Sequence, residues 1–123
     1  ESFILGKGLQ DGLKRAKAYS EAGADLILIH SKEKNPKEIF SFSKIFRTKK
    51  YYKPLVSVPS TYSKTTESTL EKNGFKIVIY ANHMLRAAYP AMQNVAKTIL
   101  KNQRSFELED KISSVKEVIN LIK

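Results

Sequence analysis

The sequence predicts an α/β fold in which helices alternate with the strands of one parallel sheet. Two segments, 21–30 and 71–80, repeat one pattern, in which a helical stretch ends near a glycine and a short aliphatic run follows. The aliphatic runs lack polar alternation, which is typical of strands that helices cover on both faces. The length of 123 residues suits one small doubly wound domain or half of a (β/α)8 barrel, because a whole barrel takes about 250 residues.

The first strand–helix unit is expected at the start of the sequence. Residues 3–5 are predicted to end a strand, which Gly6 terminates. Residues 8–22 then carry their apolar side chains on one stripe, and this pattern predicts an amphipathic helix. Gly23 suits the left-handed conformation that often follows a helix, and residues 26–29 are predicted as the next strand.

Prolines bound the next unit. Asn35 and Pro36 are a typical helix start, with a capping side chain followed by proline at the first helical position. The helix predicted after them is rich in phenylalanine. Residues 55–58 are predicted as a third strand, bounded by Pro54 and Pro59.

The remaining elements follow the same alternation. We predict a short helix over 66–73, a strand over 77–79 and a long amphipathic helix over 83–102. Pro90 lies inside the long helix, so it predicts either a kink or the true first turn. A terminal helix is predicted over 110–123. Such alternation favours right-handed parallel crossovers, and the length favours half of a barrel.

The composition excludes several classes of protein. The chain has 22 basic and 12 acidic residues, a net charge of +10, but 18 of the basic residues are lysine, whereas nucleic-acid readers rely on arginine. The most basic window, 32–53, is interpreted as a solvated helix face and loop, with anion attraction as the alternative. There is no cysteine, no apolar run of membrane-spanning length and no signal peptide, so we expect a cytoplasmic protein without disulfides.

Candidate site residues follow the predicted strands, because active sites of parallel α/β folds lie at the carboxyl ends of strands. His30 is the strongest candidate, as an anion ligand or a proton-transfer group, and its structural alternative is a hydrogen bond to a nearby carbonyl. Ser60 and Asn82 are candidates for binding a substrate. Residues 6–8, with two glycines, either bring amides toward a phosphate or form a tight turn.

Other kinds of site lack support in the sequence. There is no nucleotide-binding glycine pattern, no Gly-x-Ser-x-Gly motif and no histidine pair at metal-binding spacing. Glu1 and Glu33 are the carboxylates near the predicted strand ends, which is too few for a hard divalent cation. We therefore expect no metal ligand in this chain.

A resemblance to a known family rests on segments 2–9, 21–25, 29–32, 58–62, 79–92 and 114–117. Together these segments resemble the phosphoenolpyruvate mutase family of the isocitrate lyase superfamily. The resemblance covers nearly the whole chain. Its most specific part is Tyr-Ala-Asn-His-Met-Leu-Arg-Ala-Ala at 80–88, which favours mutases over lyases that act on methylisocitrate.

The resemblance implies the C-terminal half of a (β/α)8 TIM barrel, strands five to eight, over residues 1–104. Residues 105–123 would form a helical extension that contacts another subunit of a dimer or tetramer. The implied reaction is the Mg²⁺-dependent isomerisation of phosphoenolpyruvate to phosphonopyruvate, a step of phosphonate biosynthesis. By the same resemblance, His30 contacts the phosphoryl group and Glu1 matches the acidic residue of an Arg-x-Glu pattern.

The resemblance also implies that essential parts lie outside this sequence. The nucleophilic aspartate, the acidic Mg²⁺ ligands and a gating loop would belong to an N-terminal half, so we expect the 123-residue chain alone to be inactive. Half a barrel has two open strand edges and an uncovered face, and we expect it to fold poorly or self-associate. The apolar stripe of the terminal helix would cover either its own barrel or a neighbouring subunit.

Two alternatives remain open at this point. Phosphonopyruvate hydrolase shares the fold and most of the site, and other enzymes of the superfamily act on C–C or C–P bonds. A basic, non-catalytic anion-binding module belongs to a different class. For the enzyme, we expect a small-molecule partner, phosphoenolpyruvate or phosphonopyruvate, and neither nucleic acid nor membrane.

Overall fold

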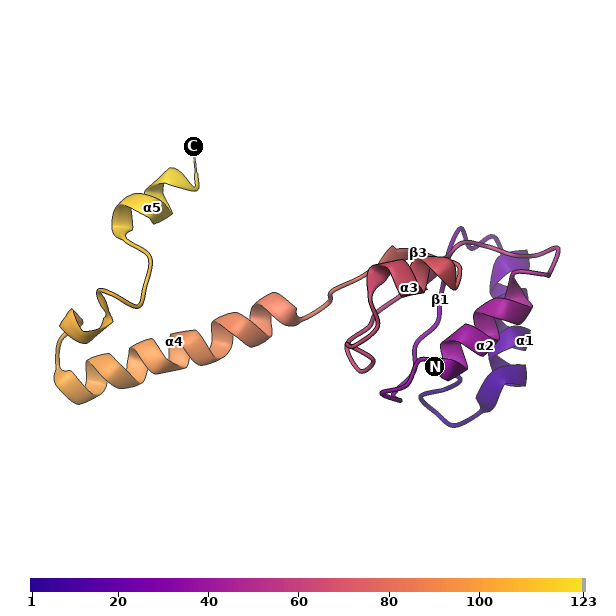
Figure 1. The fold of residues 1–123 in the computed structure, drawn as a ribbon, viewed down its shortest axis with the longest axis horizontal. Coiled ribbons are helices and arrows are strands. Elements are labelled where there is room, and N and C mark those ends of the chain that lie inside the picture. Colours follow the sequence, from indigo (N-terminus) through magenta and orange to yellow (C-terminus); the bar gives the residue numbers. More distant parts are fainter. Residues whose placement is uncertain (123) are drawn as a thin grey trace. The chain divides into compact units, whose positions relative to one another are not determined.

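The computed structural model describes residues 1–122, and the chain divides into two compact units, Glu1–Ala81 and Asn82–Lys123 (Figure 1). In the described part of the first unit, helices alternate with strands, as the sequence predicts. The elements are α1 (Gly8–Glu21), β1 (Ile27–Leu28), α2 (Lys37–Phe46), β2 (Leu55–Ser57), α3 (Glu67–Lys72) and β3 (Phe75–Val78).

The three strands form one parallel sheet in the order β1-β2-β3, which confirms the predicted α/β class. Ile27 lies opposite Leu55, and Ser57 lies opposite Val78, with a register shift between Leu55 and Val56. Each strand is followed by a helix and then by the next parallel strand, which is the arrangement of a strand–helix–strand crossover unit. The carboxyl ends of the strands therefore meet at one edge of the sheet.

Residues 3–5 do not form the predicted strand. The amide of Leu5 donates to the carbonyl of Glu1 at 2.9 Å, and the amide of Lys7 donates to the carbonyl of Ser2 at 2.8 Å. These local bonds use donors that a sheet ladder would need, and Gly6, at φ 68°, turns the chain toward α1. Phe3 is nevertheless 5% exposed and belongs to the core. The segment thus contributes a side chain to the core but does not pair with a strand of the sheet.

Local capping explains where the helices of this unit begin and end. Gly23 and Gly74 have φ of 99° and 90°, so the prediction of a left-handed glycine after a helix is confirmed. Thr66 caps α3, its side chain accepting a hydrogen bond from the Thr69 amide. Pro36 stands at the cap of α2 instead of its first turn, because its carbonyl accepts from the Phe40 amide at 3.0 Å, and Asn35 Oδ1 accepts from the Lys37 amide at 3.1 Å.

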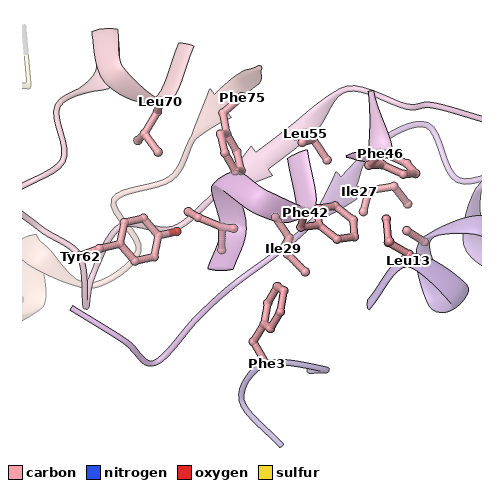
Figure 2. Packing of buried hydrophobic residues seen from close by; sticks show 12 residues of the cluster. Phe3, Leu13, Ile27, Ile29, Phe42, Phe46, Leu55, Tyr62, Leu70 and Phe75 are labelled. Atoms are coloured by element: carbon pink, nitrogen blue, oxygen red, sulfur yellow. The ribbon is translucent and has the colours of Figure 1, made fainter. Parts of the chain in front are cut away.

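The core of the first unit lies between the sheet and the helices (Figure 2). Phe42 and Phe46 of α2 are fully buried, and their rings stack with centroids 5.2 Å apart. Leu55 of the central strand and Leu70 of α3 are also fully buried. Side chains from every helix and strand of the unit therefore share one apolar cluster.

The opposite face of the sheet is open. Leu28 is 52% exposed and Ile77 is 40% exposed, although their strand neighbours lie in the core. The strands β1 and β3 are thus not covered on both faces, as their aliphatic runs indicated, but have the uncovered face that half of a barrel implies, whereas Val56 of the central strand is 5% exposed. The physical reason is that α1, α2 and α3 all contribute to one cluster, on the side of Ile27 and Phe75. The result is an apolar sheet face with open edges at β1 and β3.

The second unit contains α4 (His83–Asn102), the 3-10 helix η1 (Phe106–Leu108) and α5 (Val115–Asn120). The predicted bounds of the long helix are confirmed. The helix runs through Pro90, so the alternative that it starts there is wrong. The terminal helix is shorter than predicted, because it begins at a capping box of Ser114 and Glu117; the last predicted residue, 123, lies outside the described residues.

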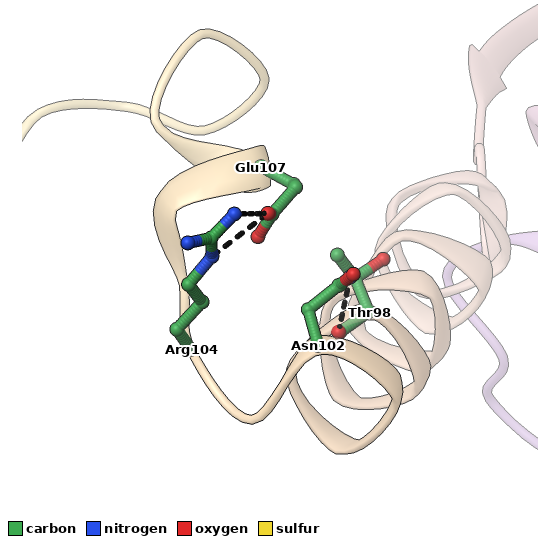
Figure 3. A network of polar contacts seen from close by, with 4 residues as sticks. All are labelled: Thr98, Asn102, Arg104 and Glu107. Carbon is green, nitrogen blue, oxygen red and sulfur yellow. Dashed lines mark hydrogen bonds and ion pairs between the residues drawn. The ribbon is translucent and has the colours of Figure 1, made fainter.

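Local polar contacts shape the segment between α4 and η1 (Figure 3). Gln103 ends α4 in the left-handed conformation at φ 54°. Arg104 donates to Glu107 Oε1 through Nη2 at 2.6 Å, and this hydrogen bond lowers the pKa of Glu107. Asn102 Nδ2 donates to the Thr98 carbonyl at 2.9 Å.

None of the described helices is long and apolar enough to cross a membrane.

Candidate functional site

The ends of β1 and β2 are tied together by a side chain. Thr61 Oγ1 donates a hydrogen bond to the carbonyl oxygen of Ser31 at 2.7 Å, which joins residues thirty positions apart. The rings of His30 and Tyr62 lie next to each other, with centroids 6.1 Å apart and planes at 48°. The structure thus brings His30 and the segment 58–62, which contains Ser60, to the same edge of the sheet.

The residue after His30 is held by its side chain as well. Ser31 is fully buried, and its Oγ donates to Glu38 Oε2 at 2.6 Å. The same oxygen accepts from the amide of Glu33 at 3.0 Å. Ser31 therefore bonds with α2, with its own loop and, through Thr61, with the loop after β2.

Strand alternation places His30 on the open face of the sheet. Ile27 and Ile29 face the helices and are nearly fully buried, whereas Leu28 between them is exposed. His30 lies two residues past the end of β1, and the alternation of the strand, continued to this position, puts it on the side of Leu28. A molecule on the open face at the strand ends would therefore meet this imidazole.

The surroundings of His30 favour its neutral form. Burial lowers the pKa of His30, and a hydrogen bond with the backbone of Val58 acts in the opposite direction. Since the ordinary value is 6.5, the imidazole is mainly neutral at pH 7. The interaction with the Val58 backbone fits the structural alternative that the sequence left open for His30, and Nδ1 is buried without a hydrogen bond of good geometry in the described protein. A neutral imidazole has one N–H to donate and one nitrogen to accept a proton.

Further hydroxyls at the end of β2 also lack partners. Ser57 Oγ and Ser60 Oγ are buried without a hydrogen bond in the described residues, whereas the Tyr62 hydroxyl interacts with the backbone of Val58. Burial raises the pKa of Tyr62, so its hydroxyl stays protonated. Figure 2 shows Tyr62 beside the apolar cluster, to which it belongs. Buried polar groups normally have hydrogen-bond partners. Buried hydroxyls without partners near one strand end are therefore typical of a place that receives water or a polar ligand.

The other predicted site residues lie in different surroundings. Glu1 is exposed, and it lines a cavity of about 240 Å³ that also touches Arg15 and Tyr19. Asn82 belongs to the second unit, where it caps α4 without a side-chain hydrogen bond. Residues 6–8 form a tight turn that leads into α1, in which both glycines have positive φ.

The sequence reasoning missed the bonds that converge on Ser31. Its hydroxyl partner, Glu38, lies seven residues further along, in the first turn of α2. A serine and a glutamate at that spacing carry no recognisable signal before the helix start is known. Thr61 is recognisable as a hydroxyl after a predicted strand, but the sequence does not indicate its acceptor.

Comparison with known proteins adds a decisive observation. A family model described as phosphoenolpyruvate phosphomutase matches residues 1–100. The chain belongs to this family. The recognition made from the sequence segments is thereby confirmed.

Curated relatives include both a mutase and a hydrolase. The chain is 43% identical over 121 residues to the phosphoenolpyruvate phosphomutase of Tetrahymena pyriformis, covering 98% of the chain and 39% of the relative. It is 44% identical over 124 residues to the phosphonopyruvate hydrolase of Variovorax sp. (strain Pal2), covering 98% of the chain and 41% of the relative. The chain thus spans about two fifths of the length of these relatives, and identity does not separate the two activities.

Solved structures give the same result. The phosphoenolpyruvate phosphomutase of Streptomyces platensis subsp. rosaceus matches with a TM-score of 0.82 at 37% identity, over 93% of this chain and 39% of that one. A phosphonopyruvate hydrolase in complex with oxalate and Mg²⁺ matches with a TM-score of 0.86 at 43% identity, over 98% and 42%. These matches confirm the predicted fold class, part of a family barrel.

The residues of this family member do not by themselves fit a magnesium ion. Among the described residues, no group of three or more His, Cys, Asp or Glu side chains lies close enough together to hold a metal. Glu38, which contacts the loop after His30, is bonded to Ser31. Mg²⁺ prefers several oxygen ligands in octahedral geometry. The described chain therefore offers donors for an anion rather than ligands for the cation.

Proposed function

We propose that this chain supplies the His30 side of the active site of a phosphoenolpyruvate mutase. The observation that carries the proposal is His30 itself, a neutral imidazole on the open face at the strand ends of a chain that belongs to this family. The substrate class is a three-carbon carboxylate with a phosphoryl group. In the proposed reaction the O–P bond of phosphoenolpyruvate breaks and a C–P bond forms, so no atom enters or leaves.

The chemistry suits the groups that the chain provides. A transferring phosphoryl group spreads negative charge over its oxygens, and hydrogen-bond donors held in place stabilise it. We assign to His30 one N–H bond to a phosphoryl oxygen, and to Ser60 Oγ a second donor at the same strand edge. The anion would raise the pKa of His30 and oppose the effect of burial. The open face must be covered in the working enzyme, because bulk water would weaken these bonds.

A phosphonopyruvate hydrolase is the second candidate. It is favoured by the 44% identity to the Variovorax relative and by a TM-score of 0.87 to a hydrolase structure. In that reaction water takes the phosphoryl group, the C–P bond breaks, and pyruvate and phosphate result. The proposed role of His30 is the same in both reactions.

Two chimaeras test the proposal. In each, this chain replaces the matching segment of a relative, the Tetrahymena mutase or the Variovorax hydrolase. Phosphorus NMR then follows phosphonopyruvate, phosphoenolpyruvate and free phosphate. We expect the mutase chimaera to interconvert the first two without phosphate, and the hydrolase chimaera to lose much of its phosphate release. An inactive mutase chimaera beside a fully active hydrolase chimaera would support the hydrolase instead.

Substitution of His30 measures its share of the reaction. In the active chimaera, His30→Gln should lower kcat/KM about a hundredfold, the usual loss for one phosphoryl or oxyanion donor. Circular dichroism and the melting temperature show whether the variant is folded. Activity within threefold of the parent would remove His30 from the site. The unfused chain should show no turnover, because its described residues lack a metal-binding group.

A further inference from the structure

The sheet ladder ends just before His30. The last backbone hydrogen bond from this strand to β2 runs from the Ile29 amide to the Val56 carbonyl, at 3.3 Å. Beyond this point His30 and Ser31 contact β2 and its loop through the Thr61 bond to Ser31, the ring contact with Tyr62 and the backbone of Val58. Contacts of the loops, instead of sheet pairing, therefore hold the His30 ring.

These side chains form a connected arrangement. Thr61 Oγ1 donates to the carbonyl of Ser31, and Glu38 Oε2 accepts from the Ser31 hydroxyl, so the residue after His30 is held through its carbonyl and its side chain. Tyr62 follows Thr61 directly and is fully buried, so the same bond keeps its ring beside the imidazole. Loss of the Thr61 bond would release both contacts together.

We propose that Thr61 and Glu38 are positioning residues for His30, acting through Ser31. Small displacements of a group that binds a reacting atom cost large factors in rate, so a fixed imidazole is an advantage to the site. The catalytic consequence rests on the proposed function, whereas the effect on the imidazole does not. A purely structural role is the competing explanation, in which Thr61 only satisfies a buried carbonyl.

Histidine NMR on the full chain tests the effect on the ring. The parent is compared with Thr61→Val, which keeps the shape and loses the donor, and with Thr61→Ser, which restores the donor. Thr48→Val is a matched control, because Thr48 Oγ1 also donates to a backbone carbonyl, that of Ile45 at 2.8 Å, away from His30. A structural role would affect stability in both valine variants and leave the His30 resonances in place.

The expected result is specific to Thr61. Thr61→Val should shift the His30 ring resonances and move its titration upward toward 6.5, because the loop that buries the ring loosens. The groups facing the ring, the Tyr62 phenol and the Val58 backbone, are present in every variant. Thr61→Ser and Thr48→Val should titrate as the parent does. An unchanged His30 in a folded Thr61→Val chain would overturn the proposal.

A second variant covers the case in which Thr61→Val does not fold. Ser31→Ala removes the bonds to Glu38 and Glu33 but keeps the carbonyl that Thr61 binds. It should produce the same kind of shift at His30. If the His30 resonances are unchanged in a folded Ser31→Ala chain, the proposal fails.

Kinetics separate this proposal from the proposed function. In the active chimaera, Thr61→Val should lower kcat about tenfold with a smaller change in KM, and Thr61→Ser should stay within twofold of the parent. A shifted His30 ring without any turnover in the chimaera would reject the proposed reaction and keep the positioning role. Normal turnover in Thr61→Val would reject the positioning role and keep the reaction.

Discussion

Both units of this chain contain helices, but the units differ in how far their apolar side chains are buried. In Glu1–Ala81, the helices cover a sheet and bury whole side chains such as Phe42 and Leu70. In the described part of the second unit, Leu108 is the one buried residue, and none of the twenty residues of α4 is buried. Apolar side chains such as Met84 (85%) and Leu100 (79%) are exposed instead.

The difference shows what secondary structure does not supply. A helix forms through bonds within one segment, but most of its stability in proteins comes from packing one face. The first unit has such packing within its own residues, and in the second unit the described contacts are mainly local. We therefore expect substitutions of equal chemistry to have unequal effects in the two units.

The largest expected contrast is between two apolar residues. Phe42→Ala should destabilise the first unit by about 3–5 kcal/mol, because it empties a fully buried site, whereas Leu100→Ala in α4 should change stability by less than about 0.5 kcal/mol. Urea unfolding followed by circular dichroism and tyrosine signals measures both, since the chain has no tryptophan. Equal effects would mean that the units share a core.

A glycine pair sharpens the view of packing in the first unit. Gly74 and Gly23 both have positive φ, but a Cβ at Gly74 would lie 2.5 Å from Arg47 Cδ, whereas one at Gly23 would meet nothing within 4 Å. Gly23→Ala should cost about 1 kcal/mol from the backbone alone, and Gly74→Ala about 2 kcal/mol, because Arg47 must also move. Equal shifts in the urea midpoint would show that Arg47 adapts without cost.

Each unit has a helix with a side-chain cap, so the effect of losing a cap can be compared between the units. Thr66 caps α3, and Ser114 caps α5 with a hydrogen bond from the Glu117 amide. Replacement of either by alanine should cost about 1 kcal/mol of helix stability. Thr66→Ala should move the unfolding transition of the first unit, because Leu70 of α3 lies in its core. Ser114→Ala should reduce local helicity only, as amide exchange in α5 would show; a shift of the first unit's transition would break the comparison.

The smallest expected effect is a pH dependence that His30 gives to the first unit. Burial lowers the pKa of His30 in the folded state, so the unfolded chain binds more protons as the pH falls below about 6.5. Stability should thus be full above that pH and decrease below it, until the folded pKa is passed. His30→Gln should flatten this part of the curve. A stability that increases on acidification through this range would contradict the sign.

The chemistry of the chain explains how far the sequence could be interpreted. Glycine and proline positions predicted the ends of α1 and β2 to within about two residues, because their conformational limits act locally. The strand expected at 3–5 was wrong, since a three-residue aliphatic run does not reveal whether its amides find partners in a ladder or in a turn. For the same reason, the sequence did not reveal η1, and the terminal helix was predicted longer than it is.

For the candidate site, the sequence identified residue types and strand ends. His30 was recognisable because it follows an aliphatic strand directly, and Ser60 because it follows Pro59. Which hydroxyl ties the loops together was not recognisable, since Thr61 and Ser31 are thirty residues apart and either of the neighbouring hydroxyls could have served.

The sequence by itself determined the order of helices and strands, the parallel class and the family, because these depend on local periodicity and on short motifs. The tertiary structure alone decided that Phe3 packs without pairing, and that Thr61, Glu38 and Ser31 converge behind His30. Those features depend on contacts between distant segments, and such contacts exist only once the sheet has fixed which strand ends meet.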